Sequence, residues 1–389
     1  MFFCGVMLFP GNKTCFKTRW NVIFWLVCLC IVVQLTLSQR VPSVSQKIDL
    51  DEFLDSFSSY NMYTVTQKAT NGSVLAYVTP WNKRGFELAE TFAAKFTLIS
   101  PVWFQVLGRK KAYSVTGLPE VNKDWMARLK AINPSIKIVP RFDFREWQAS
   151  DFADTLGDRS GAEQCLANIL RILKHYEFDG AVIELWSFFV GAPEESLYNF
   201  IELIGQSLRD INMVTVLVIP PPVYRGELPG RFTKKQFERL RNHVDYFSLM
   251  TYDYSPPSGP GPNSPINWVE KCILHFVPHG SHKAAEKRAQ ILTGFNFYGL
   301  HHIPERRFGD YILGHQFVHI VNQSRADFIW DSTAAEHYLK FRDENGHENF
   351  VYYPTVASIS RRIDLVEYLG TGISIWEIGQ GLDSFFSLF

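Results

Sequence analysis

Short apolar segments recur along the chain from residue 74, separated mostly by stretches with the spacing of amphipathic helices. The apolar segments do not alternate with polar residues, which is typical of strands buried on both faces of a sheet. We expect eight such strands, at residues 74–80, 96–101, 136–142, 178–186, 214–219, 244–252, 291–297 and 372–376. Between the first five strands we expect helices at residues 84–94, 121–132, 162–175 and 195–211.

The repetition of strand and helix predicts the fold class. Repeated strand–helix units form parallel sheets, and eight of them are typical of a closed barrel. We therefore predict an α/β protein with a (β/α)8 TIM barrel at residues 74–389. The connection between the seventh and eighth strands is much longer than the others, so we predict a small α+β insertion there, at about residues 300–356. Residues 39–73 are polar and without clear period, and we expect them to form a lead-in segment.

The N-terminal residues 1–38 have the organisation of a secretory signal peptide. Basic residues precede the apolar run at residues 22–33, and small residues follow it up to Ser38. This order is typical of a signal peptide, and we expect cleavage near Ser38. A signal anchor is the alternative, because flanking apolar residues lengthen the run toward the roughly 20 residues that a membrane span needs.

Cleavage at Ser38 would leave Cys165 and Cys272 as the cysteines of the mature chain. Two cysteines do not make a disulfide scaffold, so the domain must be large enough to be stabilised by its core. Both lie among apolar residues, where a buried free thiol is the usual state, and one disulfide is the alternative. Asn71 and Asn322 begin N-x-S sequences and would be glycan acceptors in a secreted chain.

The charge balance excludes several classes of function. The chain has 39 basic and 39 acidic residues, and a net charge of zero removes the electrostatic basis for binding nucleic acid or an acidic membrane surface. It suits an uncharged ligand such as a neutral sugar. No metal-ligand spacing, nucleophile elbow or glycine-rich phosphate loop occurs, so we expect neither a metal nor another cofactor.

Aromatic residues make up 15% of the chain, and several fall at the C-terminal ends of the expected strands. Sites in TIM barrels are built at these ends, and aromatic rings stack on sugars as well as filling cores. Among them, Tyr77, Trp81, Trp186, Tyr252 and Trp376 are candidates for contact with a carbohydrate. For each of them, packing inside the barrel is the alternative.

Three motifs on three expected strands, in register, resemble glycoside hydrolase family 18, the chitinases and chitinase-like lectins. They are Phe178-Asp179-Gly180 on the fourth strand, Met250-Thr251-Tyr252-Asp253 on the sixth, and Gly372–Trp376 on the eighth. The resemblance extends from about Val74 to Gln380. It implies a cleft for N-acetylglucosamine oligosaccharides, with Tyr252 and Asp253 at the acetamido group and Trp376 at the floor.

The fourth strand departs from the family pattern D-G-x-D-x-D-x-E. Aligning Asp179-Gly180 with its start puts Val182, Glu184 and Trp186 at the three catalytic positions, with Trp186 at that of the general acid. Because these residues are two apart on a strand, we expect all three to face the barrel interior. Family 18 hydrolysis is substrate-assisted, and the missing acid protonates the leaving oxygen. An indole cannot supply that proton.

The resemblance and this departure together predict a catalytically inactive lectin for chitooligosaccharides or other N-acetylglucosamine-containing glycans. The candidate binding residues are Tyr77, Trp81, Glu184, Trp186, Met250, Tyr252, Asp253, Asn296 and Trp376. Trp186 is expected to present a broad ring face at the mouth of the site. A buried Glu184 needs a partner, for which Arg141 and Tyr252 are candidates, and a structural ion pair is its alternative role.

Two other functions stay open at this point: a weak hydrolase that uses Glu184, and a protein-interaction module with a vestigial cleft. The resemblance further implies a secreted or lysosomal location and a scavenger-receptor-type protein partner. No membrane contact beyond the N-terminal segment is expected.

Overall fold

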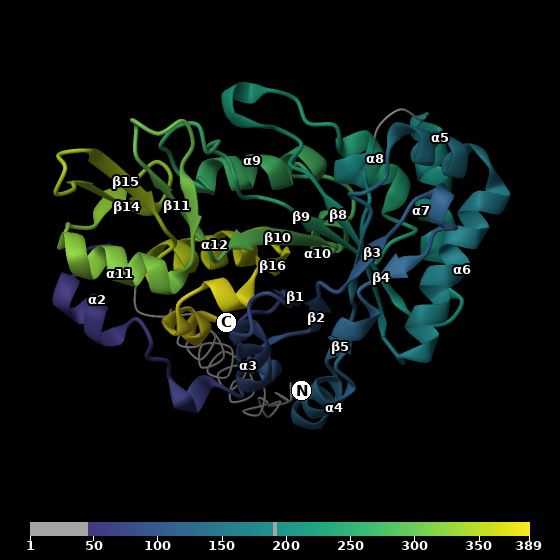
Figure 1. Ribbon diagram of the computed structural model, residues 1–389, viewed down its shortest axis with the longest axis horizontal. Helices are drawn as coiled ribbons and strands as arrows, with labels where there is room; N and C mark the ends of the chain where they lie inside the picture. The colour runs from purple at the N-terminus through teal and green to yellow at the C-terminus, as the bar shows by residue number, and fades with distance from the viewer. Residues whose placement is uncertain (1–45, 190–192) are drawn as a thin grey trace, which may run out of the picture. The chain divides into compact units, whose positions relative to one another are not determined.

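A curled sheet of parallel strands forms the centre of the computed structural model (Figure 1). The structure describes residues 46–189 and 193–389, so the predicted signal peptide lies outside the described residues. The barrel strands are β1 Val74–Val78, β2 Leu98–Pro101, β5 Lys137–Ile138 with β6 Arg141–Asp143, β7 Gly180–Glu184, β8 Val214–Ile219, β9 Tyr246–Leu249, β10 Ile291–Asn296 and β16 Gly372–Trp376. Each falls within an expected segment except β6, which extends one residue beyond it, and the predicted TIM barrel is confirmed.

The third barrel strand is divided into β5 and β6 by Pro140, which has no backbone N–H to give to a neighbouring strand. Pairing nevertheless continues across the division. The Val139 N–H donates to the Ile99 carbonyl at 2.8 Å, and the Pro140 carbonyl accepts from the Val182 N–H at 2.9 Å. β5 therefore joins β2 and β6 joins β7, which closes the barrel.

Helices cover the outer face of the barrel (Figure 1). They are α3 Arg84–Thr91, α4 Lys123–Ile132, α5 Ala149–Gly157, α6 Arg159–His175, α7 Glu194–Arg209, α8 Lys234–Leu240, α9 Ile266–Phe276, α10 Ala284–Ala289 and α12 Val356–Leu369. In α6 the buried residues Cys165, Ile169 and Ile172 recur at intervals of three and four, which puts them on one face. Cys165 and Cys272 are buried free thiols, as predicted. None of the helices in the described ranges has the length and hydropathy of a membrane-spanning segment.

The predicted α+β insertion between the last two barrel strands is present. It contains β11 Gly299–His302, β12 Asp310–Ile312, α11 Gly314–Ser324, β13 Ile329–Asp331, β14 Glu336–Arg342 and β15 Glu348–Tyr352. The strands form an antiparallel sheet in the order β12-β11-β15-β14-β13. A buried ion pair at 2.7 Å between Glu336 of β14 and Arg362 of α12 joins the insertion to the barrel layer.

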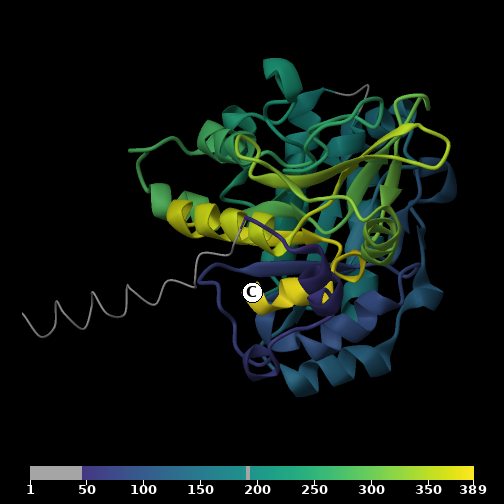
Figure 2. The same cartoon turned by 90° about the vertical axis from the view of Figure 1, so that its left-hand side faces the viewer.

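The lead-in segment contains more structure than its pattern indicated. A short helix, α2 Leu50–Ser56, begins at Asp49, whose carboxylate accepts from the backbone N–H groups of two first-turn residues. Phe53 packs against Phe317 and Phe328 of the insertion, with ring centroids 5.9 and 5.0 Å away. Figure 2 shows this purple segment beside the yellow C-terminal residues, where the Asn61 N–H donates to Ser387 Oγ at 3.1 Å. With seven residues, α2 is too short for a helical period to be recognised in the sequence.

Candidate functional site

Asp179 and Gly180 fix the start of β7 against its neighbours. The Asp179 carboxylate accepts from the Ile138 N–H at 2.7 Å and pairs with the Lys130 ammonium at 2.7 Å. At Gly180 the backbone φ is +158°, and an added Cβ would lie 2.1 Å from the Val214 carbonyl oxygen. The pair therefore sets the register of the strand that carries Val182 and Glu184.

Four charged side chains meet at the C-terminal ends of β6 and β7. Arg141 Nε lies 2.7 Å from Glu184 Oε2, and Arg141 Nη2 lies 2.5 Å from Asp143 Oδ2. Arg145 also binds Asp143, through Nε at 2.6 Å. Two cations thus face two carboxylates, and the cluster carries no net charge when all four are ionised.

Glu184 occupies the interior as expected, with Arg141 as its partner. Burial raises the pKa of Glu184, and the positive charge of Arg141 opposes that rise. The Arg141 guanidinium also lies over the Trp376 ring, 5.3 Å from its centroid, and that ring meets Tyr77 edge-on at 5.1 Å. The Tyr77 hydroxyl donates to Ser248 Oγ at 3.0 Å. Tyr77, Glu184 and Trp376 are therefore held together inside the barrel by protein contacts.

The orientation predicted for Trp186 is wrong. β7 ends at Glu184, and Leu185 has helical backbone angles, so the alternation of faces stops before Trp186. The indole packs between the barrel and its covering elements, with Phe232 at 4.9 Å and Tyr198 at 6.0 Å between ring centroids. Only 5% of Trp186 is exposed, so little of its ring face is open for stacking on a sugar.

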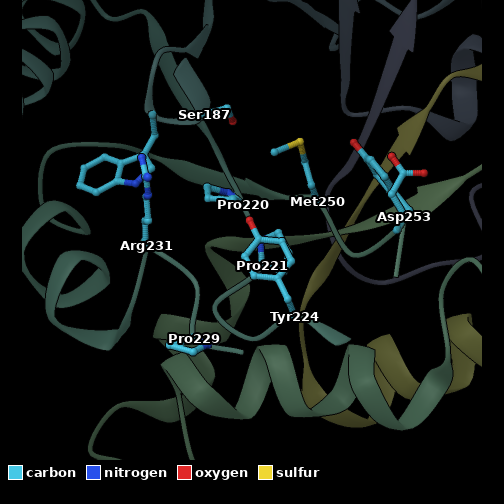
Figure 3. Close-up of a pocket in the computed structure, with 10 residues that line it drawn as sticks. Ser187, Pro220, Pro221, Tyr224, Pro229, Arg231, Met250 and Asp253 are labelled. Carbon is cyan, nitrogen blue, oxygen red and sulfur yellow. The ribbon is translucent and has the colours of Figure 1, made fainter. Parts of the chain in front are cut away.

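A pocket of about 420 Å³ opens where β7, β8 and β9 end (Figure 3). Its lining comes from the loops after these three strands: Trp186, Ser187, Pro220, Pro221, Tyr224, Pro229, Arg231, Met250, Tyr252 and Asp253. Of the predicted binding residues, the pocket brings together Trp186, Met250, Tyr252 and Asp253. Prolines, Met250 and aromatic rings give the pocket an apolar surface with a few polar groups, which is the usual make-up of a ligand site.

Asp253 is held in place by two hydrogen bonds. Its backbone, at a positive φ of 59°, donates to Asn263 Oδ1 at 2.7 Å, and its carboxylate accepts from the Tyr298 hydroxyl at 2.6 Å. The surrounding protein desolvates the carboxyl and raises its pKa, while the hydrogen bond from Tyr298 acts in the opposite direction. Burial also raises the pKa of Tyr252 well above its ordinary value, so its phenol stays a neutral donor.

The remaining predicted residues do not line this pocket. Trp81 follows β1 and is 66% exposed. Asn296 is buried and donates to the Tyr298 carbonyl at 2.8 Å, which supports the tyrosine that binds Asp253. Asn71 and Asn322 are both exposed, the latter within α11.

Sequence reasoning missed Asp143 and Arg145 inside the barrel mouth, and Ser187, Tyr224 and Arg231 in the pocket. Arg141, Asp143 and Arg145 alternate with phenylalanines at the end of a strand, a period of two that could have identified the charged cluster. No comparable signal marks Arg231, because it lies in an irregular connection between β8 and α8.

Comparison with known proteins decides the family. The model of the glycosyl hydrolases family 18 matches residues 73–381. The chain belongs to this family. A chitinase from Chromobacterium violaceum has a similar structure, with a TM-score of 0.68 and 20% identity over 82% of this chain and 97% of that one. A family 18 chitinase from Cycas revoluta in complex with (GlcNAc)3 gives a TM-score of 0.65 at 12% identity, covering 81% and 97%.

The curated relatives of this family 18 protein are distant. The cortical fragment-lytic enzyme of Bacillus anthracis is 23% identical over 232 residues, which are 58% of this chain and 52% of that enzyme. An uncharacterised glycosylase of Bacillus subtilis is 17% identical over 59% of this chain and 66% of its own length. The chain thus spans between half and two thirds of the length of these relatives.

Proposed function

We propose that this family 18 protein is a lectin that binds N-acetylglucosamine-containing oligosaccharides without hydrolysing them in the ordinary way. The observation that carries the proposal is Trp186 at the position of the family's general acid. An indole N–H has no accessible pKa and cannot protonate a leaving oxygen. A positioned acid contributes about 10²–10⁴ in rate, and this contribution is missing.

The pocket beside Trp186 supports binding. Met250 and the prolines after β8 provide an apolar surface for the C–H faces of a sugar ring. At one end, the Asp253 carboxylate can accept hydrogen bonds from sugar O–H or N–H groups, and the neutral Tyr252 phenol can donate one. The Cycas revoluta chitinase, a protein of the same fold, is known in complex with an N-acetylglucosamine trisaccharide.

A second candidate function is weak hydrolysis with Glu184 as the acid. The raised pKa of Glu184 favours it, because a protonated carboxyl is what a general acid requires. Its ion pair with Arg141 argues against it, since the guanidinium stabilises the ionised form. The cortical fragment-lytic enzyme and the chitinase that resemble this chain are enzymes, which is a further reason to test for hydrolysis.

Calorimetric titration with chitotetraose, combined with a turnover assay on a fluorogenic chitooligosaccharide, tests the proposal. We expect binding without turnover, and roughly tenfold weaker binding for Asp253→Asn, since a hydrogen bond to a charged group is lost. Asp327→Asn, an exposed carboxylate outside the pocket, is the matched control and should bind like the wild type.

Other outcomes separate the rival functions. Turnover that disappears in Glu184→Gln would establish the hydrolase and refute the lectin. Neither binding nor turnover would favour a protein-interaction module with a vestigial cleft.

We place this lectin in the secretory pathway or the lysosomal lumen. The support is the N-terminal sequence and a resemblance of the segments at residues 178–186 and 372–386 to chitinase domain-containing protein 1, the stabilin-interacting chitinase-like protein. By that resemblance, a scavenger-receptor-type protein is the proposed partner.

A further inference from the structure

The charges around the site are matched in pairs, with one exception among the cations. Arg141 and Arg145 at the barrel mouth are bound by Glu184 and Asp143. In the described part of the chain, the side chain of Arg231 has neither an ion pair nor a hydrogen bond. It is exposed and is the only cationic residue among those that line the pocket. Its positive charge is therefore available to a ligand.

Arg231 lies at the opposite end of the pocket from Asp253 (Figure 3). Pro220, Pro221 and Met250 lie between them in the same view. The positive charge of Arg231 acts on a neighbouring residue of the lining. Burial raises the pKa of Tyr224, and the charge of Arg231 opposes that rise. The pocket thus has an acceptor end, an apolar middle and a cationic end.

A neutral chitooligosaccharide uses the first two of these regions but leaves the guanidinium without a partner. Guanidinium groups bind carboxylates through two parallel hydrogen bonds, a geometry that a neutral hydroxyl cannot reproduce. A net charge of zero for the whole chain does not oppose this, since recognition depends on the local charge of the pocket.

We propose that Arg231 makes the pocket selective for N-acetylhexosamine oligosaccharides that carry a carboxylate, over neutral ones of the same length. This inference rests on the proposed lectin function and names its ligand class. The carboxylate can come from a lactyl ether on the N-acetylglucosamine ring or from a neighbouring hexuronic acid. Both sources present the same group to the guanidinium.

The test compares three tetrasaccharides by calorimetry: chitotetraose, the same β-1,4 backbone with 3-O-lactyl groups on alternate sugars, and a tetrasaccharide of alternating N-acetylglucosamine and glucuronic acid. We expect at least one carboxylated ligand to bind about tenfold more tightly than chitotetraose at low salt. The preference should shrink as salt is raised, since the Arg231 side chain is exposed. Which of the two binds more tightly identifies the carboxylate source.

Variants of Arg231 test whether this residue causes the preference for carboxylated ligands. Arg231→Gln should remove the preference, so that carboxylated and neutral tetrasaccharides bind with similar affinity, and Arg231→Lys should retain part of it. Arg225→Gln is the matched control, because Arg225 is exposed in the same connection but does not line the pocket. It should keep the full preference.

Equal binding of all three tetrasaccharides, or a preference that survives in Arg231→Gln, would overturn the inference and leave the lectin function standing. Absence of binding by every ligand would instead overturn the lectin function itself.

Discussion

The buried carboxylates near the barrel mouth differ in whether a positively charged side chain lies beside them. Glu184 has Arg141 at 2.7 Å. Glu377, directly after Trp376, is fully buried and accepts from Asn82 Nδ2 at 2.7 Å and from the Gly379 N–H at 3.0 Å. Burial raises the pKa of Glu377 from its ordinary 4.5 to about 7, and the two hydrogen bonds oppose that rise. Burial thus favours the protonated form of Glu377 in the folded protein.

This gives Glu377 a definite effect on stability. Between pH 4.5 and about 7 the folded protein binds a proton that the unfolded chain has released, so the contribution of Glu377 to stability falls as the pH rises through this window. The total loss is about 3 kcal/mol. In Glu377→Gln the group no longer titrates, and the dependence on pH should be flatter by that amount.

Urea unfolding of wild type and Glu377→Gln at pH 5 and pH 7.5 measures the difference. Asp327→Gln, an exposed carboxylate, serves as the control and should follow the wild type. Parallel pH dependence of wild type and Glu377→Gln would show that Glu377 has an ordinary pKa in the folded protein.

At the scale of elements, the turn after β7 determines where the Trp186 side chain packs. Its indole holds the turn against α7 and the loop that carries Phe232. Trp186→Ala should lower the free energy of unfolding by about 3–5 kcal/mol, the usual cost of removing a buried large aromatic side chain. Trp186→Phe should cost clearly less, since it keeps most of the ring contacts.

Chemical unfolding measures these costs, and chitotetraose titration of the folded variants separates packing from binding. The packing role predicts that Trp186→Phe binds within a few-fold of wild type. A large loss of affinity with unchanged stability would mean that Trp186 is a stacking platform after all.

The same turn shows what the sequence could and could not predict. The eight barrel strands were predictable because most of their residues are buried and their segments are therefore largely apolar. The alternation of faces predicted the inward position of Glu184 but not the helical angles at Leu185, which no residue type in the segment requires. The short elements α2, β3 Phe104–Val106 and β4 Val115–Thr116 were missed because too few residues carry their pattern.

The pocket was predictable only in part, for a related reason. Met250, Tyr252 and Asp253 belong to a recognisable motif at the end of one strand, whereas Arg231 reaches the pocket from an irregular connection. Positions in such connections depend on tertiary packing, which periodicity does not report.

At the scale of the whole molecule, a barrel of the family 18 type carries a pocket at the C-terminal ends of β7, β8 and β9. Asp179 and Gly180 set the register of β7, and in the proposed alignment Trp186 stands at the position of the family's acid. The proposed lectin thus keeps a pocket for the sugar and lacks the acid that would cleave it. That combination is the central claim: an oligosaccharide binds and stays intact.

A crystal structure of the protein soaked with chitotetraose tests this claim most directly. We expect an intact tetrasaccharide along the pocket, with a sugar ring over Met250 and hydrogen bonds to Asp253 and Tyr252. Shortened saccharides at this position, or a pocket that stays empty at saturating ligand, would contradict it.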